Sequence, residues 1–196
     1  MIVKTMKRVL KVLYSTKYLM ITNCMTGIVS VTIGDSVQQI IEFKTDSLKD
    51  QEFGLNIRRN VNMSFAGLYF GVFGHFWYGF LDKRFPGANP SQVLKKLMAE
   101  MAMGPPLVSG LFLIISKFKG KSLTDSWTDL KSQFVLICTV EWLVYIPLQY
   151  INFSFVSPKY RYLFVATISL CYDAFLSYVI YKNDRLRRLK TLGEDK

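Results

Sequence analysis

The hydrophobic positions of this chain gather in five windows of at least 20 residues, each free of Lys and Arg and each holding a single Asp, Glu or His. A helix needs about 20 consecutive apolar residues to cross the hydrocarbon core of a bilayer. The pattern therefore predicts an all-α protein, a polytopic transmembrane helical bundle, and disfavours a water-soluble helical protein. The windows and their ionisable residues are 18–41 with Asp35, 60–81 with His75, 97–116 with Glu100, 132–158 with Glu141, and 162–181 with Asp173.

The third window is interrupted by Gly104-Pro105-Pro106, and prolines inside a helix remove backbone donors. If this window does not cross, the loops and ends place a charge of +13 on one side of the membrane and +2 on the other; five crossings give +10 and +5. The larger asymmetry agrees better with the tendency of cations to stay on one side. We therefore expect about four spans plus a broken hydrophobic segment, with both termini on one side, and five spans as the alternative.

The 196 residues contain no linker, internal repeat or low-complexity tract, so one integral membrane domain, 1–196, is predicted. Residues 1–17 form a basic amphipathic N-terminus, and residues 182–196 form a basic C-terminal tail. The N-terminal pattern resembles a mitochondrial presequence. It is equally typical of a helix lying on the membrane surface, and both interpretations stay open.

Catalytic and cofactor chemistry find no support in the residue pattern. The three cysteines, Cys24, Cys138 and Cys171, lie in apolar windows without paired spacing, so neither a disulfide framework nor a zinc site is predicted. His75 is the only histidine, and no Gly-rich phosphate loop is present. We expect a protein that is not an enzyme and needs no cofactor or metal.

Small and polar residues recur at helical spacing within the windows. Gly67 and Gly71 form a G-x-x-x-G pair, which lets two helix backbones approach closely in lipid. The acids Asp35, Glu141 and Asp173 lie on such polar stripes and should face inward. Two interpretations stay open: the acids line a hydrated path that sets a charge preference, or they hold helices together through hydrogen bonds.

The fourth window carries a long motif, the run from Trp142 to Phe153 with Pro147, Gln149 and Asn152, which is followed by Arg161. This motif resembles the signature of the Mpv-seventeen/peroxisomal membrane protein family, and most of the chain is similar to that family. Phe155–Arg161 and Tyr172–Tyr178 are most similar to its Mpv-seventeen-like protein two subgroup. Ala99-Glu100 departs from the family, where an Asp-Gln pair is usual. The residues that match the family motif are Asp35, His75, Trp77, Tyr78, Trp142, Pro147, Gln149, Asn152, Phe153 and Arg161.

This resemblance implies a small helical protein of organelle membranes, in the mitochondrial inner membrane or alternatively the peroxisomal membrane. The subgroup implies support of mitochondrial ribosome assembly and translation, whereas other relatives imply a weakly selective small-solute channel. The expected partners are the lipid bilayer and the large subunit of the mitochondrial ribosome, and a homo-oligomer is left open. The ribosomal contact would be made by basic segments, including the tail residues Arg185, Arg187, Arg188 and Lys190.

Overall fold

The computed structural model describes residues 2–45 and 54–194, with the backbone alone at 2–4, 6, 7, 183 and 187–194. Every regular element in these ranges is helical, so the predicted all-α bundle is confirmed. The elements are α1 (Ile2–Leu13), α2 (Leu19–Thr45), α3 (Ile57–Arg84), α4 (Pro90–Phe118), α5 (Leu123–Phe155), the 3-10 turn η1 (Pro158–Tyr160), α6 (Arg161–Ile168) and α7 (Leu170–Glu194).

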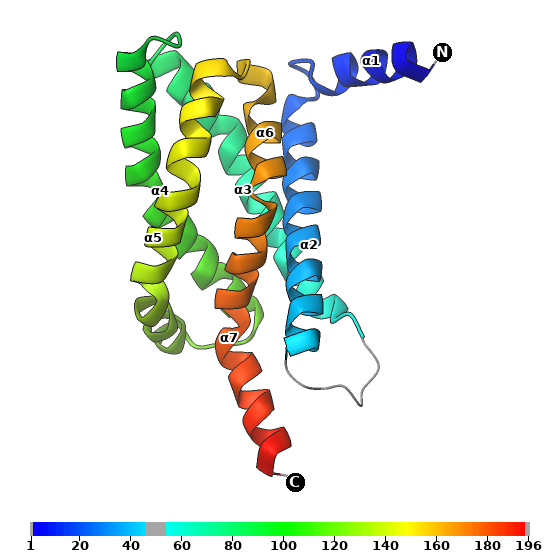
Figure 1. Cartoon of the computed structure of the whole chain (residues 1–196), viewed down its shortest axis with the longest axis vertical. Helices are drawn as coiled ribbons and strands as arrows, with labels where there is room; N and C mark the ends of the chain where they lie inside the picture. The colour runs from blue at the N-terminus through cyan, green and yellow to red at the C-terminus, as the bar shows by residue number, and fades with distance from the viewer. Residues whose placement is uncertain (1, 46–53, 195–196) are drawn as a thin grey trace.

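The long helices run side by side along one bundle axis, while α1 lies across that axis at one end (Figure 1). Helix α2 contacts α3 and α7 extensively, and α4 contacts α5. Helices α6 and α7 follow each other from one end of the bundle to the other, with a bend of 56° between them. The bundle is thus traversed five times, by α2, α3, α4, α5 and the α6–α7 pair.

Two of the described helices are long and apolar enough to cross a membrane by length and composition, namely α4 with 29 residues and α5 with 33. The bent pair of Pro158–Ile168 and Leu170–Lys182 adds a third if it forms one span. Helices α2 and α3 have 27 and 28 residues, or about 40 Å at 1.5 Å per residue, but they are more polar. Their polarity comes from side chains such as Asp35, Gln39 and Arg59, which are buried inside the bundle.

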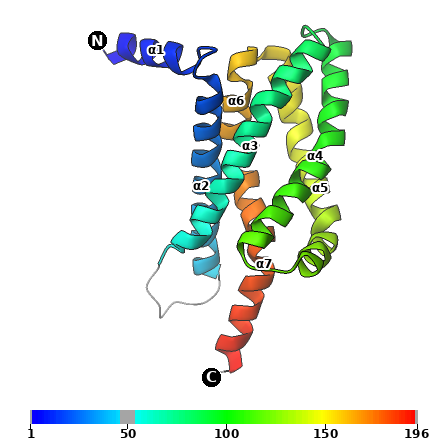
Figure 2. The ribbon, with the colours of Figure 1, turned by 180° about the vertical axis from the view of Figure 1, so that it is seen from behind.

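The Gly104-Pro105-Pro106 segment bends α4 but does not break it, which corrects the prediction of a broken segment. Both prolines lie inside one helix that continues from Pro90 to Phe118. Figure 2 shows the helix changing direction along its length. Prolines remove only the donors for the carbonyls of the preceding turn, and a helix within a bundle tolerates this loss by kinking.

The first and last helices lie at opposite ends of the bundle, an arrangement that fits the alternative of five crossings better than the expected placement of both termini on one side. Helix α1 is at one end and the last turns of α7 are at the other (Figures 1 and 2). The distribution of cations favours an arrangement in which α4 does not cross, because that arrangement gives the larger charge asymmetry. With α4 included, the end that carries α1 holds +10 and the opposite end +5.

Helices α2 and α3 approach each other through glycines. A Cβ atom added at Gly67 would lie 2.3 Å from the carbonyl oxygen of Gly27, and one added at Gly27 would lie 2.3 Å from the carbonyl oxygen of Gly67. At Gly71 an added Cβ would lie 2.6 Å from the Cα atom of Cys24. Such close approach increases the dispersion contact between the two helices. In lipid this contact matters, because no hydrophobic driving force brings helices together.

Candidate functional site

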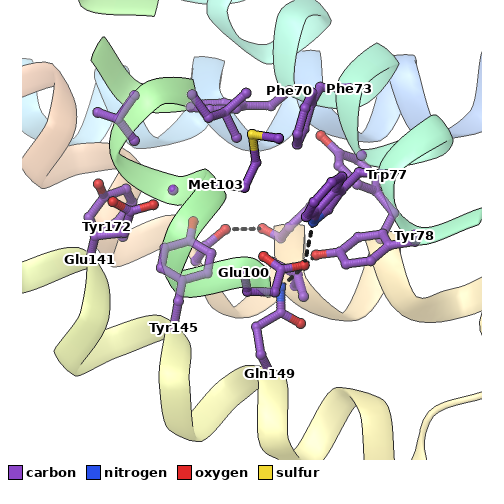
Figure 3. Close-up of a pocket in the computed structure, with 18 of the residues that line it drawn as sticks. Phe70, Phe73, Trp77, Tyr78, Glu100, Met103, Glu141, Tyr145, Gln149 and Tyr172 are labelled. Atoms are coloured by element: carbon purple, nitrogen blue, oxygen red, sulfur yellow. Dashed lines mark hydrogen bonds between the residues drawn. The ribbon is translucent and has the colours of Figure 1, made fainter. Parts of the chain in front are cut away.

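A cavity of about 100 Å³ lies within the bundle and is lined by residues of the six helices α2 to α7. Figure 3 shows side chains from several helices converging on it. Three acids line the cavity: Glu100 from α4, Glu141 from α5 and Asp173 from α7. Among the described residues that line the cavity, none is Lys or Arg. The site is therefore an acidic chamber in an apolar bundle.

One wall of the cavity is held by side-chain hydrogen bonds between α3, α4 and α5. The Trp77 indole Nε1 donates to Glu100 Oε1 at 2.9 Å, and Gln149 Nε2 donates to the Tyr78 hydroxyl at 2.8 Å (Figure 3). Asn152 Nδ2 in turn donates to Gln149 Oε1 at 2.8 Å. Four motif residues thus gather here, together with Glu100, which the sequence analysis named as the acid of the third window and as a departure from the family but not as a site residue.

The opposite wall carries polar atoms without a protein partner. Glu141 Oε2 and the Tyr172 hydroxyl have no hydrogen-bond partner among the described residues, although the two side chains are only 8% and 3% exposed. A Cβ at Gly104 would lie 2.3 Å from Glu141 Oε1, so the absence of a side chain there makes room for the carboxyl group. Asp173 differs, because its Oδ2 accepts a hydrogen bond from Ser30 Oγ at 2.6 Å.

Asp35 is not part of this chamber, which corrects the prediction of one polar path lined by Asp35, Glu141 and Asp173. Its carboxyl group is fully buried and pairs with Arg59, whose Nε donates to Asp35 Oδ1 at 2.8 Å. Ser177 Oγ donates to the same oxygen at 2.5 Å, and Gln39 Nε2 donates to Oδ2 at 2.8 Å. Only Glu141 and Asp173 of the three predicted acids line the cavity.

Arg59 also binds a second acid. Its Nη1 donates to Glu42 Oε2 at 2.6 Å and its Nη2 to Glu42 Oε1 at 3.1 Å, while the guanidinium group lies 4.5 Å from the centre of the Tyr181 ring. We call Asp35, Glu42, Arg59 and Ser177 the Arg59 cluster; it joins α2, α3 and α7 near the C-terminal end of α2. The sequence analysis missed Arg59, although an intramembrane acid is itself a signal that a partner must exist.

A second ion-paired cluster lies toward the other end of the bundle, where α3 ends. Asp82 Oδ1 accepts from Lys96 Nζ at 2.8 Å and also pairs with the guanidinium group of Arg161. Lys96 is fully buried, and both cations lie over the Phe153 ring, at 5.5 and 5.2 Å from its centre. We call Asp82, Lys96, Arg161 and Phe153 the Asp82 cluster. It joins α3, α4, α5 and α6 and includes two motif residues.

The remaining motif residues lie outside these clusters or at the cavity rim. Trp142 lines the cavity, whereas Pro147 is exposed within α5. His75 is half-buried and lies against the Phe76 ring at 5.2 Å between ring centres. Its Nδ1 has no partner among the described residues, and His75 is not one of the residues that line the cavity.

The basic tail is only partly described: the side chains of Arg187, Arg188 and Lys190 lie outside the described residues, while Arg185 is half-buried. The start of the tail is tied to the α4–α5 loop, because Asp184 pairs with Lys119 at 2.6 Å and with Lys121 at 3.5 Å. Burial alone would raise the pKa of the Asp184 carboxyl, yet these two ammonium groups hold this pKa below its ordinary value. Burial lowers the pKa of the Lys119 ammonium.

The fold and site define a polytopic helical membrane protein with an acidic internal chamber between two ion-paired clusters. Residues 116–177 match the model of the Mpv17 / PMP22 family. The "Mitochondrial inner membrane protein Mpv17" of Xenopus laevis is 30% identical over 156 residues, which cover 78% of this chain and 85% of that protein. The chain belongs to this family.

Two other relatives have similar identity, and one of them is named for a different organelle. "PXMP2/4 family protein 2" of Dictyostelium discoideum is 29% identical over 153 residues, covering 77% of this chain and 79% of that protein. "Peroxisomal membrane protein 2" of Bos taurus is 25% identical over 162 residues, covering 82% of each chain. No solved structure matches the chain. These sequence similarities support a membrane location but do not distinguish between the two organelles. The assignment to the Mpv-seventeen-like protein two subgroup stays a prediction.

Proposed function

We propose that this protein provides a path for small solutes across an organelle membrane, with the acidic cavity as its central chamber. The observation that carries the proposal is the free Glu141 Oε2 facing this cavity from a buried position. A buried polar group without a partner costs about 1–3 kcal/mol, and more when it is charged. Water or a solute in the cavity would supply the missing partner. If Glu141 served only to hold helices together, its carboxyl group would be hydrogen-bonded to a side chain of a neighbouring helix.

The two ion-paired clusters lie on either side of the chamber along α3. The Arg59 cluster lies near the start of α3 and the Asp82 cluster near its end, while the cavity is lined by residues between them, such as Phe70 and Trp77. For the organelle we propose the mitochondrial inner membrane, since the Xenopus laevis relative is named for it; the Bos taurus relative supports the peroxisome as the alternative.

Conductance of the purified protein in lipid bilayers tests the proposal. We expect the wild type to carry small ions with a preference for cations, because carboxylates attract cations and repel anions in a narrow path. Glu141→Gln should lower the ratio of cation to anion permeability, since it removes a negative charge from the chamber while keeping the size of the side chain. The measurement is the reversal potential across a salt gradient.

The matched control is Asp125→Asn, which removes an exposed acid from the first turn of the same helix. It should leave the permeability ratio unchanged. A wild type that carries no more current than protein-free bilayers would refute the path. So would a permeability ratio that is equal in the wild type and in the Glu141 variant.

A second candidate function, support of the mitochondrial ribosome, is favoured by the charge of one bundle end. Helix α1, the α3–α4 loop and η1 meet at that end (Figure 1), which carries +10 in a five-crossing arrangement. The positive-inside tendency would direct this end toward the compartment of translation. The basic tail lies at the opposite end, so one ribosome would not contact both. Among the side chains that the structure describes, the exposed cations at the +10 end are Arg8, Lys11, Lys17, Lys83, Arg84, Lys95 and Lys159.

Co-sedimentation with the large subunit of the mitochondrial ribosome tests this second function. Replacing Lys83, Arg84 and Lys95 together with Gln should reduce association at low salt, because contacts to RNA phosphates are electrostatic and salt-dependent. The matched control replaces exposed cations of the other end, Lys44, Lys117 and Lys131, with Gln and should leave association intact. Equal loss in both triple variants, or association that resists high salt, would contradict a specific contact at the +10 end.

A further inference from the structure

The three acids of the chamber differ from the acids of the two ion-paired clusters in having no cation among the described residues. Asp35 and Glu42 pair with Arg59, and Asp82 pairs with Lys96 and Arg161. Glu100, Glu141 and Asp173 form no ion pair among the described residues, and no Lys or Arg of these residues lines their cavity. Carboxyl groups without a cation in a site of low dielectric favour the neutral form, whereas a positive charge brought in from outside stabilises the ionised form.

An independent observation points to a ligand at one of these carboxyls. Glu141 is 8% exposed, and its Oε2 has no partner among the described residues. The Tyr172 hydroxyl is unpartnered as well and lies on the same side of the chamber (Figure 3). In its ionised state the Glu141 carboxylate can only accept hydrogen bonds, so the partner that it lacks in that state is a donor, for which an N–H group of a cation is suited.

The rest of the wall is aromatic. The rings of Trp77, Tyr145 and Tyr172 line the cavity, and the Tyr145 and Tyr172 rings meet edge to face at 5.0 Å between their centres. Ring faces attract cations, and organic ammonium ions are commonly recognised by carboxylates and rings together. A divalent metal would need several oxygen ligands, yet the described residues contain no group of three His, Cys, Asp or Glu that could hold one.

The size of the cavity limits the ligand. Pockets for drug-sized molecules have volumes of about 300–1,000 Å³. This cavity, at about 100 Å³, suits a cation of only a few heavy atoms. Its volume, charge and wall together favour the class of small alkylammonium ions.

We propose that the cavity is a binding site for a small alkylammonium cation, with the ammonium group held by Glu141 and the alkyl carbons against Trp77 and Tyr145. The inference rests on the proposed function in that the same chamber would receive the transported solute. It adds the chemical class of that solute, a cation with apolar carbon rather than an anion or a neutral polar molecule.

Titration of the purified protein in lipid nanodiscs tests the site. The probes are methylammonium chloride and tetramethylammonium chloride, with tert-butanol as an uncharged molecule of similar shape and sodium acetate as an anion. Binding is measured by calorimetry and by the fluorescence of Trp77 and Trp142, which line the cavity. We expect saturable binding of both ammonium ions, methylammonium through N–H donation to Glu141 and tetramethylammonium, which has no N–H, through its charge and contact with the rings. We expect no binding of tert-butanol or acetate.

Two variants locate the contact. Glu141→Gln should weaken binding of both ammonium ions about tenfold or more, equivalent to about 1.4 kcal/mol. Tyr145→Leu should weaken tetramethylammonium more than methylammonium, because it removes a ring that contacts alkyl carbon. Asp125→Asn should bind like the wild type. Thermal unfolding of each variant confirms that the protein analysed is folded.

Equal binding of tert-butanol and tetramethylammonium would overturn the inference, because it would indicate an apolar cavity without charge recognition. Unchanged ammonium affinity in Glu141→Gln would overturn it as well. Binding without conductance would refute the solute path and leave the cation site in place. Conductance without ammonium binding would refute the cation site and leave the path.

Discussion

Replacing Arg59 with Met should destabilise the folded protein by about 3–5 kcal/mol, the range measured when one partner of a buried ion pair is removed. The guanidinium group neutralises both Asp35 and Glu42, whose carboxyl oxygens lie 2.8 and 2.6 Å from it. Without Arg59, two acids would remain close together in a site that excludes water. The expected result is a large loss of monodisperse protein in detergent and a lower midpoint of thermal unfolding.

A triple variant distinguishes two causes of this loss of stability, the unpaired charge of the acids and the lost packing of the Arg59 side chain. Arg59→Met combined with Asp35→Asn and Glu42→Gln should recover much of the lost stability, because no buried charge is then left without a partner. The matched control is Arg58→Met, since Arg58 is the exposed neighbour on the same helix. If the variants at Arg59 and Arg58 unfold alike, the cluster does not stabilise the bundle as we infer.

Replacing Gly67 with Leu should lower the yield of folded protein and destabilise it by at least about 1–3 kcal/mol, the usual cost of overpacking a core. The nearest atom to an added Cβ is a backbone carbonyl oxygen of Gly27, at 2.3 Å. A backbone atom cannot rotate away as a side chain can, so α2 and α3 would have to separate. The measurements are folded yield in detergent and the thermal midpoint.

Gly79 provides a matched control on the same helix, because an added Cβ there meets nothing within 4 Å. Gly79→Leu should keep or raise stability, since Gly is about 0.8–1.0 kcal/mol less favourable than Ala within a helix and Leu is close to Ala. Normal stability of Gly67→Leu would show that the α2–α3 contact is looser than the distances indicate. A loss at Gly79 equal to that at Gly67 would point to a general effect of the substitution.

Local composition decides most of the secondary structure of this protein. Long runs without Lys or Arg become helices because a backbone in lipid must satisfy its own hydrogen bonds, and a helix does so within a single segment. Local composition does not decide, however, whether a helix continues through the proline segment. Pro105 and Pro106 remove local donors, but whether α4 then breaks or bends depends on the helices around it, which no local pattern contains.

The sequence by itself determined the all-α membrane class, the family resemblance and the presence of acids within apolar helices. Tertiary structure alone decided which acids are neutralised. Asp35 and Arg59 are separated by a whole loop and meet only because of the register between α2 and α3. Glu100 looked like a mere departure from the family motif, yet the position of α4 turns it toward the cavity beside Glu141 and Asp173. Helical periodicity gives the face on which a side chain lies, whereas its electrostatic environment depends on the neighbouring helices that the packing brings against that face.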